Sequence, residues 1–176
     1  MFQQLKQLFG KKLSTANVDV NHPAPDFSLP DEKKNIVKLS DFRNKRDVLL
    51  FFIRGDFCPF CQMMLRTYQK EQEKFKKRNV MMISIGPGPV SVNHQIVEKF
   101  GLDYKVLCDE KQRIIKEYGL NDAEDKRMYQ EGMPIPASFL IDHKGIVRYR
   151  TRANKTEEIF NPSDIFEVLE LLPEKN

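Results

Sequence analysis

Six consecutive apolar residues at positions 48–53, bounded by Asp47 and Arg54, predict a strand that is covered on both faces. A half-exposed strand would alternate apolar and polar side chains, and this run does not alternate. Residues 80–85 form a second, nearly continuous apolar run. Since both runs need cover on two sides, we expect helices on both faces of one sheet.

Strand and helix patterns alternate along the rest of the chain, and a hairpin and a final helix close it. The shorter strand signals lie at 27–29, 36–39, 104–107, 137–141 and 146–150; the helical signals lie at 58–78, 91–100, 111–118 and from Asn161 onward. Asn161 is a suitable N-cap, and Pro162 suits the first helical position. This order predicts an α/β fold with three layers, in which a central mixed sheet carries helices on both faces.

The N-terminal residues 1–13 form a separate feature, with apolar residues at 2, 5, 8 and 9 and a glycine at 10. This spacing predicts a short amphipathic helix, which we expect to dock on the domain or on a partner subunit rather than on a membrane. Residues 14–176 then form a single domain. The N-terminus has no continuous apolar stretch and no small-residue cleavage site, so we expect a cytoplasmic protein.

Charge and cysteine content exclude several classes of protein. The net charge of +4 is modest, and acidic residues interrupt the basic ones in the helical segment 58–78, so we expect no nucleic-acid partner. No apolar run reaches the roughly 20 residues that cross a bilayer. Three cysteines in a chain without an export signal favour reduced thiols over a framework of structural disulfides.

The segment Cys58-Pro59-Phe60-Cys61 stands between a buried strand and a helix. If Cys58 is the N-cap, its sulfur faces the free N–H groups of the first turn and the positive end of the helix dipole. Both stabilise the thiolate, so the pKa should fall from about 8.5 to between about 3.5 and 7.5. Arg54 adds a positive charge nearby and Asp56 a negative one. Cys61 lies one turn inward on the same helix face and is the expected resolving thiol.

Two other interpretations of the pair are weaker. The cysteines are small residues that two buried helix positions can hold, but their place at a helix start favours chemistry. A zinc site needs two further ligands, and Cys108, His22, His94 and His143 are irregularly spaced, so we expect no metal and no cofactor. Cys108 ends a strand and is expected to be a small buried core residue.

The segment 51–61 resembles the redox centre of the redoxin branch of the thioredoxin superfamily, which includes the peroxiredoxin (alkyl hydroperoxide reductase/thiol-specific antioxidant) proteins and the TlpA-like proteins. Segments 24–30, 38–42 and 136–142 resemble the same group. The resemblance implies a thioredoxin-like fold. It also implies that Pro136 is a cis-proline facing the cysteine pair, with the backbone of Ile135 open to a bound peptide. The supporting residues of the site are then Pro136, Ile135, Arg54, Pro59 and Phe60.

Departures from this resemblance bear on the reaction. Peroxiredoxins carry a threonine three residues before the reacting cysteine, where this chain has Gly55, and an arginine near the position of Pro136. Arg54 and Arg148 are candidate substitutes for these groups. The acid that precedes the first cysteine in thioredoxin is replaced by Phe52, and Met64 stands where TlpA-like proteins often have a glutamate.

The sequence therefore predicts a thiol–disulfide oxidoreductase in which Cys58 is the nucleophile and Cys61 resolves the mixed disulfide. One alternative is a thiol peroxidase that reduces hydrogen or alkyl peroxides through Cys58. Another is a non-enzymatic binding protein that retains the fold. The expected partners are a protein or small-molecule disulfide, or a peroxide, together with a thiol donor such as a thioredoxin or glutathione system. The sequence is compatible with an oligomer.

Overall fold

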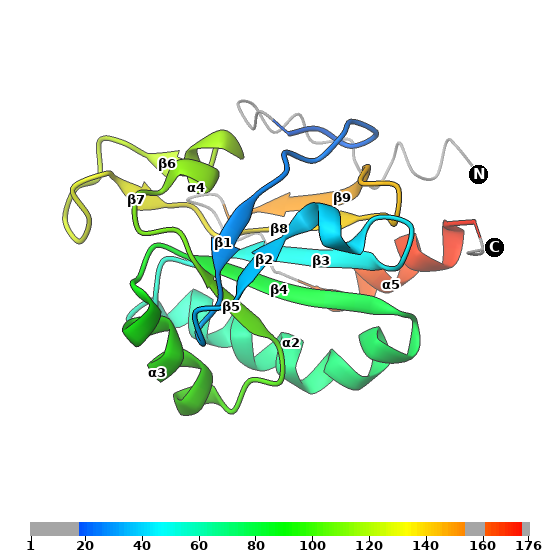
Figure 1. Cartoon of the computed structure of the whole chain (residues 1–176), viewed down its shortest axis with the longest axis horizontal. Coiled ribbons are helices and arrows are strands. Elements are labelled where there is room, and N and C mark those ends of the chain that lie inside the picture. Colours follow the sequence, from blue (N-terminus) through cyan, green and yellow to red (C-terminus); the bar gives the residue numbers. More distant parts are fainter. Residues whose placement is uncertain (1–17, 154–160, 174–176) are drawn as a thin grey trace.

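A central five-stranded sheet organises the computed structural model, which describes residues 18–153 and 161–173. Its strand order is β5-β4-β3-β8-β9 (Figure 1). The strand β3 pairs in parallel with β4, and β4 in parallel with β5, whereas β8 runs antiparallel to β3 and β9 antiparallel to β8. The predicted mixed sheet is confirmed, and the apolar strand lies at its centre.

The sheet strands are β3 (Asp47–Phe52), β4 (Val80–Gly86), β5 (Lys105–Cys108), β8 (Ala137–Ile141) and β9 (Val147–Arg152). The helices are the 3-10 helix η1 (Leu39–Phe42), α2 (Pro59–Lys77), α3 (Val90–Phe100), α4 (Arg113–Glu117) and α5 (Pro162–Leu171). Two small antiparallel pairs complete the fold: β1 (Ser28–Pro30) with β2 (Ile36–Lys38), and β6 (Asn121–Asp122) with β7 (Met133–Pro134). Each predicted strand and helix within the described residues has a counterpart here.

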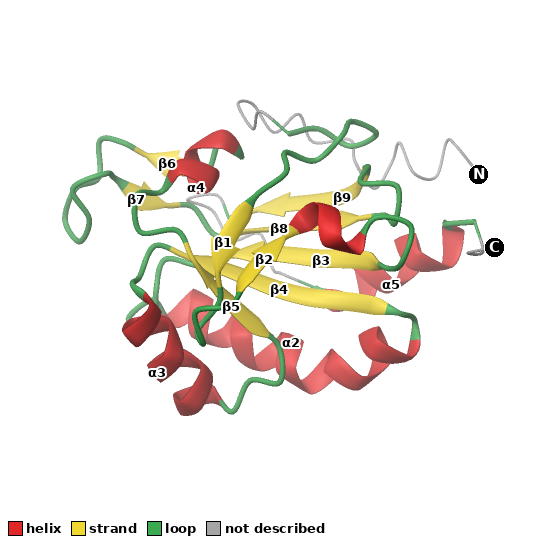
Figure 2. Cartoon of the chain, viewed as in Figure 1, coloured by secondary structure: helices red, strands yellow, loops and turns green. Residues whose placement is uncertain are grey.

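Two apolar cores lie on opposite faces of the sheet. The helix-side core joins Leu49 and Phe51 of β3, and Ile53 directly after it, to buried residues of α2, α3 and α5. The hairpin-side core joins Leu50 and Phe52 to the β1–β2 hairpin, η1 and α4. Figure 2 shows α2 and α5 behind the strands and the hairpin in front of them. Every residue of β3 is buried, as its unbroken apolar run predicts.

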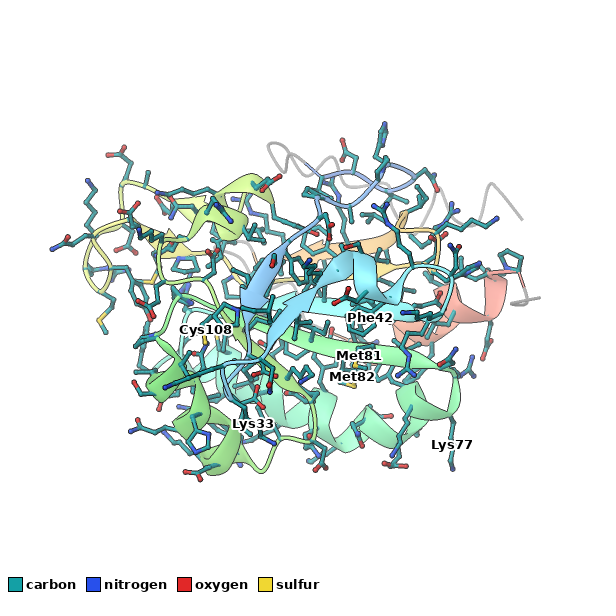
Figure 3. The ribbon with its side chains drawn as sticks, in the orientation of Figure 1. Lys33, Phe42, Lys77, Met81, Met82 and Cys108 are labelled. Atoms are coloured by element: carbon teal, nitrogen blue, oxygen red, sulfur yellow. The ribbon has the colours of Figure 1, made fainter. Side chains whose placement is uncertain are left out.

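The neighbouring residues Met81 and Met82, labelled in Figure 3, show the alternation along β4. Met81 packs against the hairpin-side core, whereas Met82 is buried in the helix-side core. On the side of the hairpin-side core, the sheet is covered by the β1–β2 hairpin and the short helices η1 and α4 rather than by long helices. No helix within the described residues has the length and apolar character needed to cross a membrane.

The helices α2 and α5 follow the patterns that the sequence predicts for them. The predicted stripe of α2 is buried, and it consists of Cys61, Met64, Leu65, Tyr68 and Phe75. The helix α5 begins as predicted: the Asn161 side chain accepts a hydrogen bond from the N–H of Ser163, and Pro162 follows as the first helical residue. The predicted N-terminal helix falls within residues 1–17, outside the described residues.

Candidate active site

Cys58 is the N-cap of α2, in the position that the sequence predicts. Its backbone is extended, with φ −88° and ψ 114°, and Pro59 is the first helical residue. The N–H of Cys61 donates to Cys58 Sγ at 3.4 Å. Cys58 is 7% exposed and Cys61 is fully buried. The two sulfurs therefore belong to one helical turn, with the first close to the surface and the second beneath it.

Several groups stabilise the Cys58 thiolate. The hydrogen bond from the Cys61 thiol is the largest influence, and it lowers the pKa of Cys58 to about 6 against the opposing effect of burial. The N–H groups of Cys61 and Phe60 and the charge of Arg54 act in the same direction. Because the pKa lies below neutral pH, Cys58 is mostly a nucleophilic thiolate under physiological conditions.

Cys61 has the opposite character. Its pKa is raised far above that of a free thiol, first by the hydrogen bond to Cys58, then by burial and by the Cys58 charge. The N–H of Arg54 donates to Cys61 Sγ at 3.3 Å, and the backbone amides of Arg54 and Gly55 both lower the pKa of Cys61. The pair therefore consists of one thiolate that is slightly accessible to solvent and one fully buried thiol.

The side chains of Arg54 and Asp56, which carry opposite charges, have different partners. Arg54 Nε donates to the carbonyl oxygen of Pro134 at 2.9 Å, while its charge still lowers the pKa of Cys58. Asp56 instead forms an ion pair with Lys99 Nζ at 2.8 Å. This pairing compensates the carboxylate charge beside the site, so the positive contribution of Arg54 is the one that acts on the thiolate.

The backbone conformation and the surroundings of Gly55 favour a glycine at the position where peroxiredoxins carry a threonine. Its φ of +148° is one that residues with a side chain rarely adopt. A Cβ here would also lie 2.8 Å from Cε1 of Phe57 and 3.1 Å from the hydroxyl oxygen of Tyr129. A threonine at position 55 would therefore be strained and would require the Phe57 ring to move, and the hydroxyl of Tyr129 occupies space next to this peptide.

The prediction of a cis peptide bond before Pro136 is wrong. No peptide bond within the described residues is cis, so the Ile135–Pro136 bond is trans. The chain enters β8 through backbone hydrogen bonds that this geometry satisfies: the N–H of Ile135 donates to Leu120 O at 2.6 Å, and Pro136 O accepts from Ala153 N at 2.7 Å. The N–H of Ile135 is therefore not open to a bound peptide.

The predicted supporting residues come from two segments of the chain. Arg54, Pro59 and Phe60 lie beside the cysteine pair. Pro136 is buried and directly precedes β8, whose first residue Ala137 pairs with Phe52 of β3, while the Ile135 side chain packs against the hairpin-side core. Cys108 is the buried core residue expected from the sequence. Its Sγ accepts a hydrogen bond from Asn93 Nδ2 at 3.3 Å, and burial raises its pKa to about 11. Figure 3 shows Cys108 on β5, next to β1.

Sequence reasoning missed Tyr129, which lies in the polar connection between β6 and β7. Its hydroxyl donates to Arg54 O at 2.6 Å, and its ring contacts Phe57, with 6.3 Å between the centroids. The only signal in the sequence is an aromatic residue in an otherwise polar segment. Without a periodic pattern, that signal does not say what the ring contacts.

A thioredoxin-like sheet with a Cys-x-x-Cys pair at the start of a helix defines a thiol-dependent oxidoreductase. The sequence profile described as "AhpC/TSA family" matches residues 20–150, and the chain belongs to this family. Alkyl hydroperoxide reductase C of Buchnera aphidicola is 30% identical over 144 residues, which cover 75% of this chain and 69% of the relative. Thiol-disulfide oxidoreductase ResA of Geobacillus kaustophilus is 28% identical over 142 residues, covering 80% and 74%.

Solved structures agree with the fold. Peroxidoxin BcpB from Mycobacterium tuberculosis superposes with a TM-score of 0.76 at 19% identity, over 89% of this chain and 99% of that one. The reduced 2-Cys peroxiredoxin of Plasmodium vivax superposes with a TM-score of 0.72 at 22% identity, over 86% and 80%. At such identities the likeness concerns the fold alone. Family membership makes the chain a redoxin-type oxidoreductase, and the non-enzymatic alternative is left without support.

Proposed function

We propose that the protein is a thiol–disulfide oxidoreductase that acts through Cys58 and Cys61. The observation that carries the proposal is the buried Cys61 thiol held directly against the Cys58 thiolate within one helical turn. The Cys58 thiolate attacks a substrate disulfide, forms a mixed disulfide and releases one substrate thiolate. Cys61 then loses its proton and attacks Cys58 Sγ, which breaks the mixed disulfide, forms the Cys58–Cys61 bond and releases the second thiolate.

The reaction of Cys58 with the substrate removes two of the influences that keep the Cys61 thiol protonated. Two of the three influences that raise the pKa of Cys61 come from Cys58: its hydrogen bond and its charge. Both disappear once Cys58 is bonded to the substrate, because its sulfur is then neutral. Burial still opposes ionisation, whereas the backbone N–H groups of Arg54 and Gly55 favour it. Cys61 therefore becomes a better nucleophile only after Cys58 has reacted. Arg54, Pro59 and Phe60 serve to stabilise and present the Cys58 thiolate.

Peroxide reduction is the second candidate, and the names of two relatives favour it. These are the alkyl hydroperoxide reductase C of Buchnera aphidicola and peroxiredoxin Q of Triticum aestivum, the latter 28% identical over 125 residues. Against it stands Gly55, which offers no hydroxyl side chain beside Cys58 to polarise the O–O bond. In either reaction a protein or small-molecule thiol donor must reduce the Cys58–Cys61 disulfide afterwards.

One preparation of the reduced protein tests both candidates. Stopped-flow mixing with a small aromatic disulfide and, separately, with hydrogen peroxide gives two second-order rate constants for Cys58. We expect the disulfide to react faster, and the peroxide at a rate near that of a free thiol at equal thiolate fraction. Cys58→Ser should abolish both reactions. A peroxide rate constant orders of magnitude above the disulfide rate constant would replace the proposal with the thiol peroxidase.

A further inference from the structure

The connection between β6 and β7, together with β7 itself, reaches Arg54 beside the cysteine pair by two separate hydrogen bonds. The Tyr129 hydroxyl donates to the main-chain oxygen of Arg54 at 2.6 Å, and Pro134 O accepts from Arg54 Nε at 2.9 Å. The same residue donates its N–H to Cys61 Sγ at 3.3 Å. Arg54 therefore joins this connection to the resolving cysteine.

The peptide unit between Arg54 and Gly55 provides a second connection between Tyr129 and Cys61. Its oxygen accepts from Tyr129, and its N–H, which belongs to Gly55, is one of two backbone groups that lower the pKa of Cys61. The other is the N–H of Arg54, which lies 3.3 Å from Cys61 Sγ. A donor bound to a peptide oxygen polarises the unit and strengthens the hydrogen bond made by its N–H. It also fixes the orientation of the peptide plane. Both effects act on the sulfur of Cys61.

The absence of a side chain at Gly55 leaves space for the Tyr129 phenol. Gly55 has no Cβ and adopts a φ of +148°, and a Cβ there would come within 3.1 Å of the Tyr129 oxygen. Phe57 also contacts the Tyr129 ring, with 6.3 Å between the centroids. Burial, followed by the proximity of Cys61 and Asp56, raises the pKa of Tyr129, so the phenol remains a protonated donor at neutral pH.

We propose that Tyr129 is a positioning residue for the resolving step: its hydroxyl holds the Arg54–Gly55 peptide so that the amides of both residues stabilise the Cys61 thiolate as it attacks Cys58. This inference rests on the proposed function, since it assigns Tyr129 to the second of the two exchange steps. Tyr129 acts through the backbone and touches no substrate. The first step uses the Cys58 thiolate, whose pKa is set mainly by the hydrogen bond from the Cys61 side chain, so loss of the Tyr129 hydroxyl should affect this step less than the second.

The reagent dithiobis(nitrobenzoate) separates the two steps, because each releases one coloured nitrothiophenolate. The first phase is the attack of Cys58 and depends on the reagent concentration. The second is the intramolecular attack of Cys61 and does not depend on it. In Tyr129→Phe, which removes one oxygen and keeps the ring, we expect the second phase to slow about three- to tenfold, the range of one hydrogen bond. The first phase should stay within about twofold of the unmodified protein.

Tyr118→Phe is a matched control. Its hydroxyl also donates to a main-chain oxygen, that of Pro25 at 2.8 Å, but it lies in the hairpin-side core away from the cysteines. We expect the ratio of its two phases to equal that of the unmodified protein. The pH at which the second phase is half-maximal should move upward in Tyr129→Phe and stay constant in Tyr118→Phe.

Three outcomes overturn the inference: an unchanged second phase in Tyr129→Phe, an equal slowing of both phases, or the same change in Tyr118→Phe. The first phase also shows whether Tyr129→Phe is folded, since it requires an intact Cys58 site. Cys61→Ser keeps the two proposals distinct. If it retains the second phase, Cys61 is not the resolving thiol and the proposed function fails; if it loses that phase while Tyr129→Phe is unaffected, only the role of Tyr129 fails.

Discussion

At Cys58 the hydrogen bond from the Cys61 thiol has the largest effect on the pKa, and burial opposes it. Helix-start N–H groups and the charge of Arg54 follow. The low pKa of Cys58 therefore depends on Cys61 as well as on the helix. Motif-based reasoning attributes the low pKa to the N-cap position, whereas the side-chain contact is the larger contribution.

Cys61→Ala should therefore raise the pKa of Cys58 from about 6 by about one, since one strong hydrogen bond to a charged group is lost. The pH dependence of iodoacetamide alkylation measures this value directly. Cys108→Ala is the control, because Cys108 lies on β5 and bonds to Asn93, and its alkylation profile should match that of the unmodified protein. A midpoint that stays near 6 in Cys61→Ala would show that the helix N–H groups and Arg54 are sufficient.

Gly55→Ala should reduce the free energy of unfolding by about 1–3 kcal/mol, since an alanine there is strained and overlaps Phe57. Gly101→Ala isolates the backbone contribution, because Gly101 also has positive φ, +59°, but nothing lies within 4 Å of the added Cβ. Urea unfolding of the two variants should show the larger loss in Gly55→Ala. Equal losses would mean that the Phe57 ring moves aside at no cost.

At the scale of elements, an ion pair between a buried carboxylate and a partly exposed lysine holds the β1–β2 hairpin on the sheet. Asp31, in the hairpin turn, is fully buried and accepts from Lys105 Nζ of β5 at 2.6 Å and from the N–H of Asn35 at 2.8 Å. Burial raises the pKa of Asp31, but the hydrogen bonds from Lys105 and Asn35 outweigh it and lower the pKa overall. The hairpin thereby stays packed over one face of β3, the strand that leads to the redox centre.

Asp31→Asn should cost about 1–3 kcal/mol of unfolding free energy at neutral pH, because it removes the charge opposite Lys105. Since the pKa of the folded state lies below that of the unfolded chain, the stabilisation by Asp31 is present above about pH 4 and is lost as the pH falls further. Urea unfolding at neutral pH and at about pH 3 should show the difference shrinking in acid. Asp41→Asn, at an exposed position in η1, should show a smaller cost at both pH values.

The elements that the sequence predicted are those with a strong local pattern. The apolar runs that became β3 and β4, and the capped helices α2 and α5, needed no tertiary information. The short strands β6 and β7 form a two-residue pair across an irregular connection, and no periodicity marks them. The trans bond at Pro136 and the contact of Tyr129 with Arg54 depend on where that connection packs. Hydrogen bonds between segments far apart in the chain decide both, from backbone N–H groups in the first case and from the Tyr129 hydroxyl in the second, and a local pattern does not contain them.

At the scale of the whole molecule, the redox state couples to stability through the cysteine pKa values. In the reduced protein, Cys58 loses its proton near pH 6 when folded and near pH 8.5 when unfolded. Between these values the unfolded chain binds one more proton than the folded one, so stability rises with pH. Above about pH 8.5 the unfolded Cys61 also ionises while the folded Cys61 does not, and the slope reverses. In the disulfide form neither sulfur titrates.

The difference in unfolding free energy between the reduced and oxidised proteins should therefore increase from about pH 6 to about pH 8.5 and then decline. Urea unfolding of both forms across this range measures it, and all groups other than the two cysteines cancel in the difference. Because the thiolate stabilises the reduced state, the disulfide should become more oxidising over the same interval, relative to a dithiol with ordinary pKa values. A double variant with Cys58→Ser and Cys61→Ser, treated with the same oxidant and reductant, should give two coincident stability curves. If the difference between the two forms of the unmodified protein is constant with pH, Cys58 is not a stabilised thiolate, and the charge on which its reactivity depends is absent.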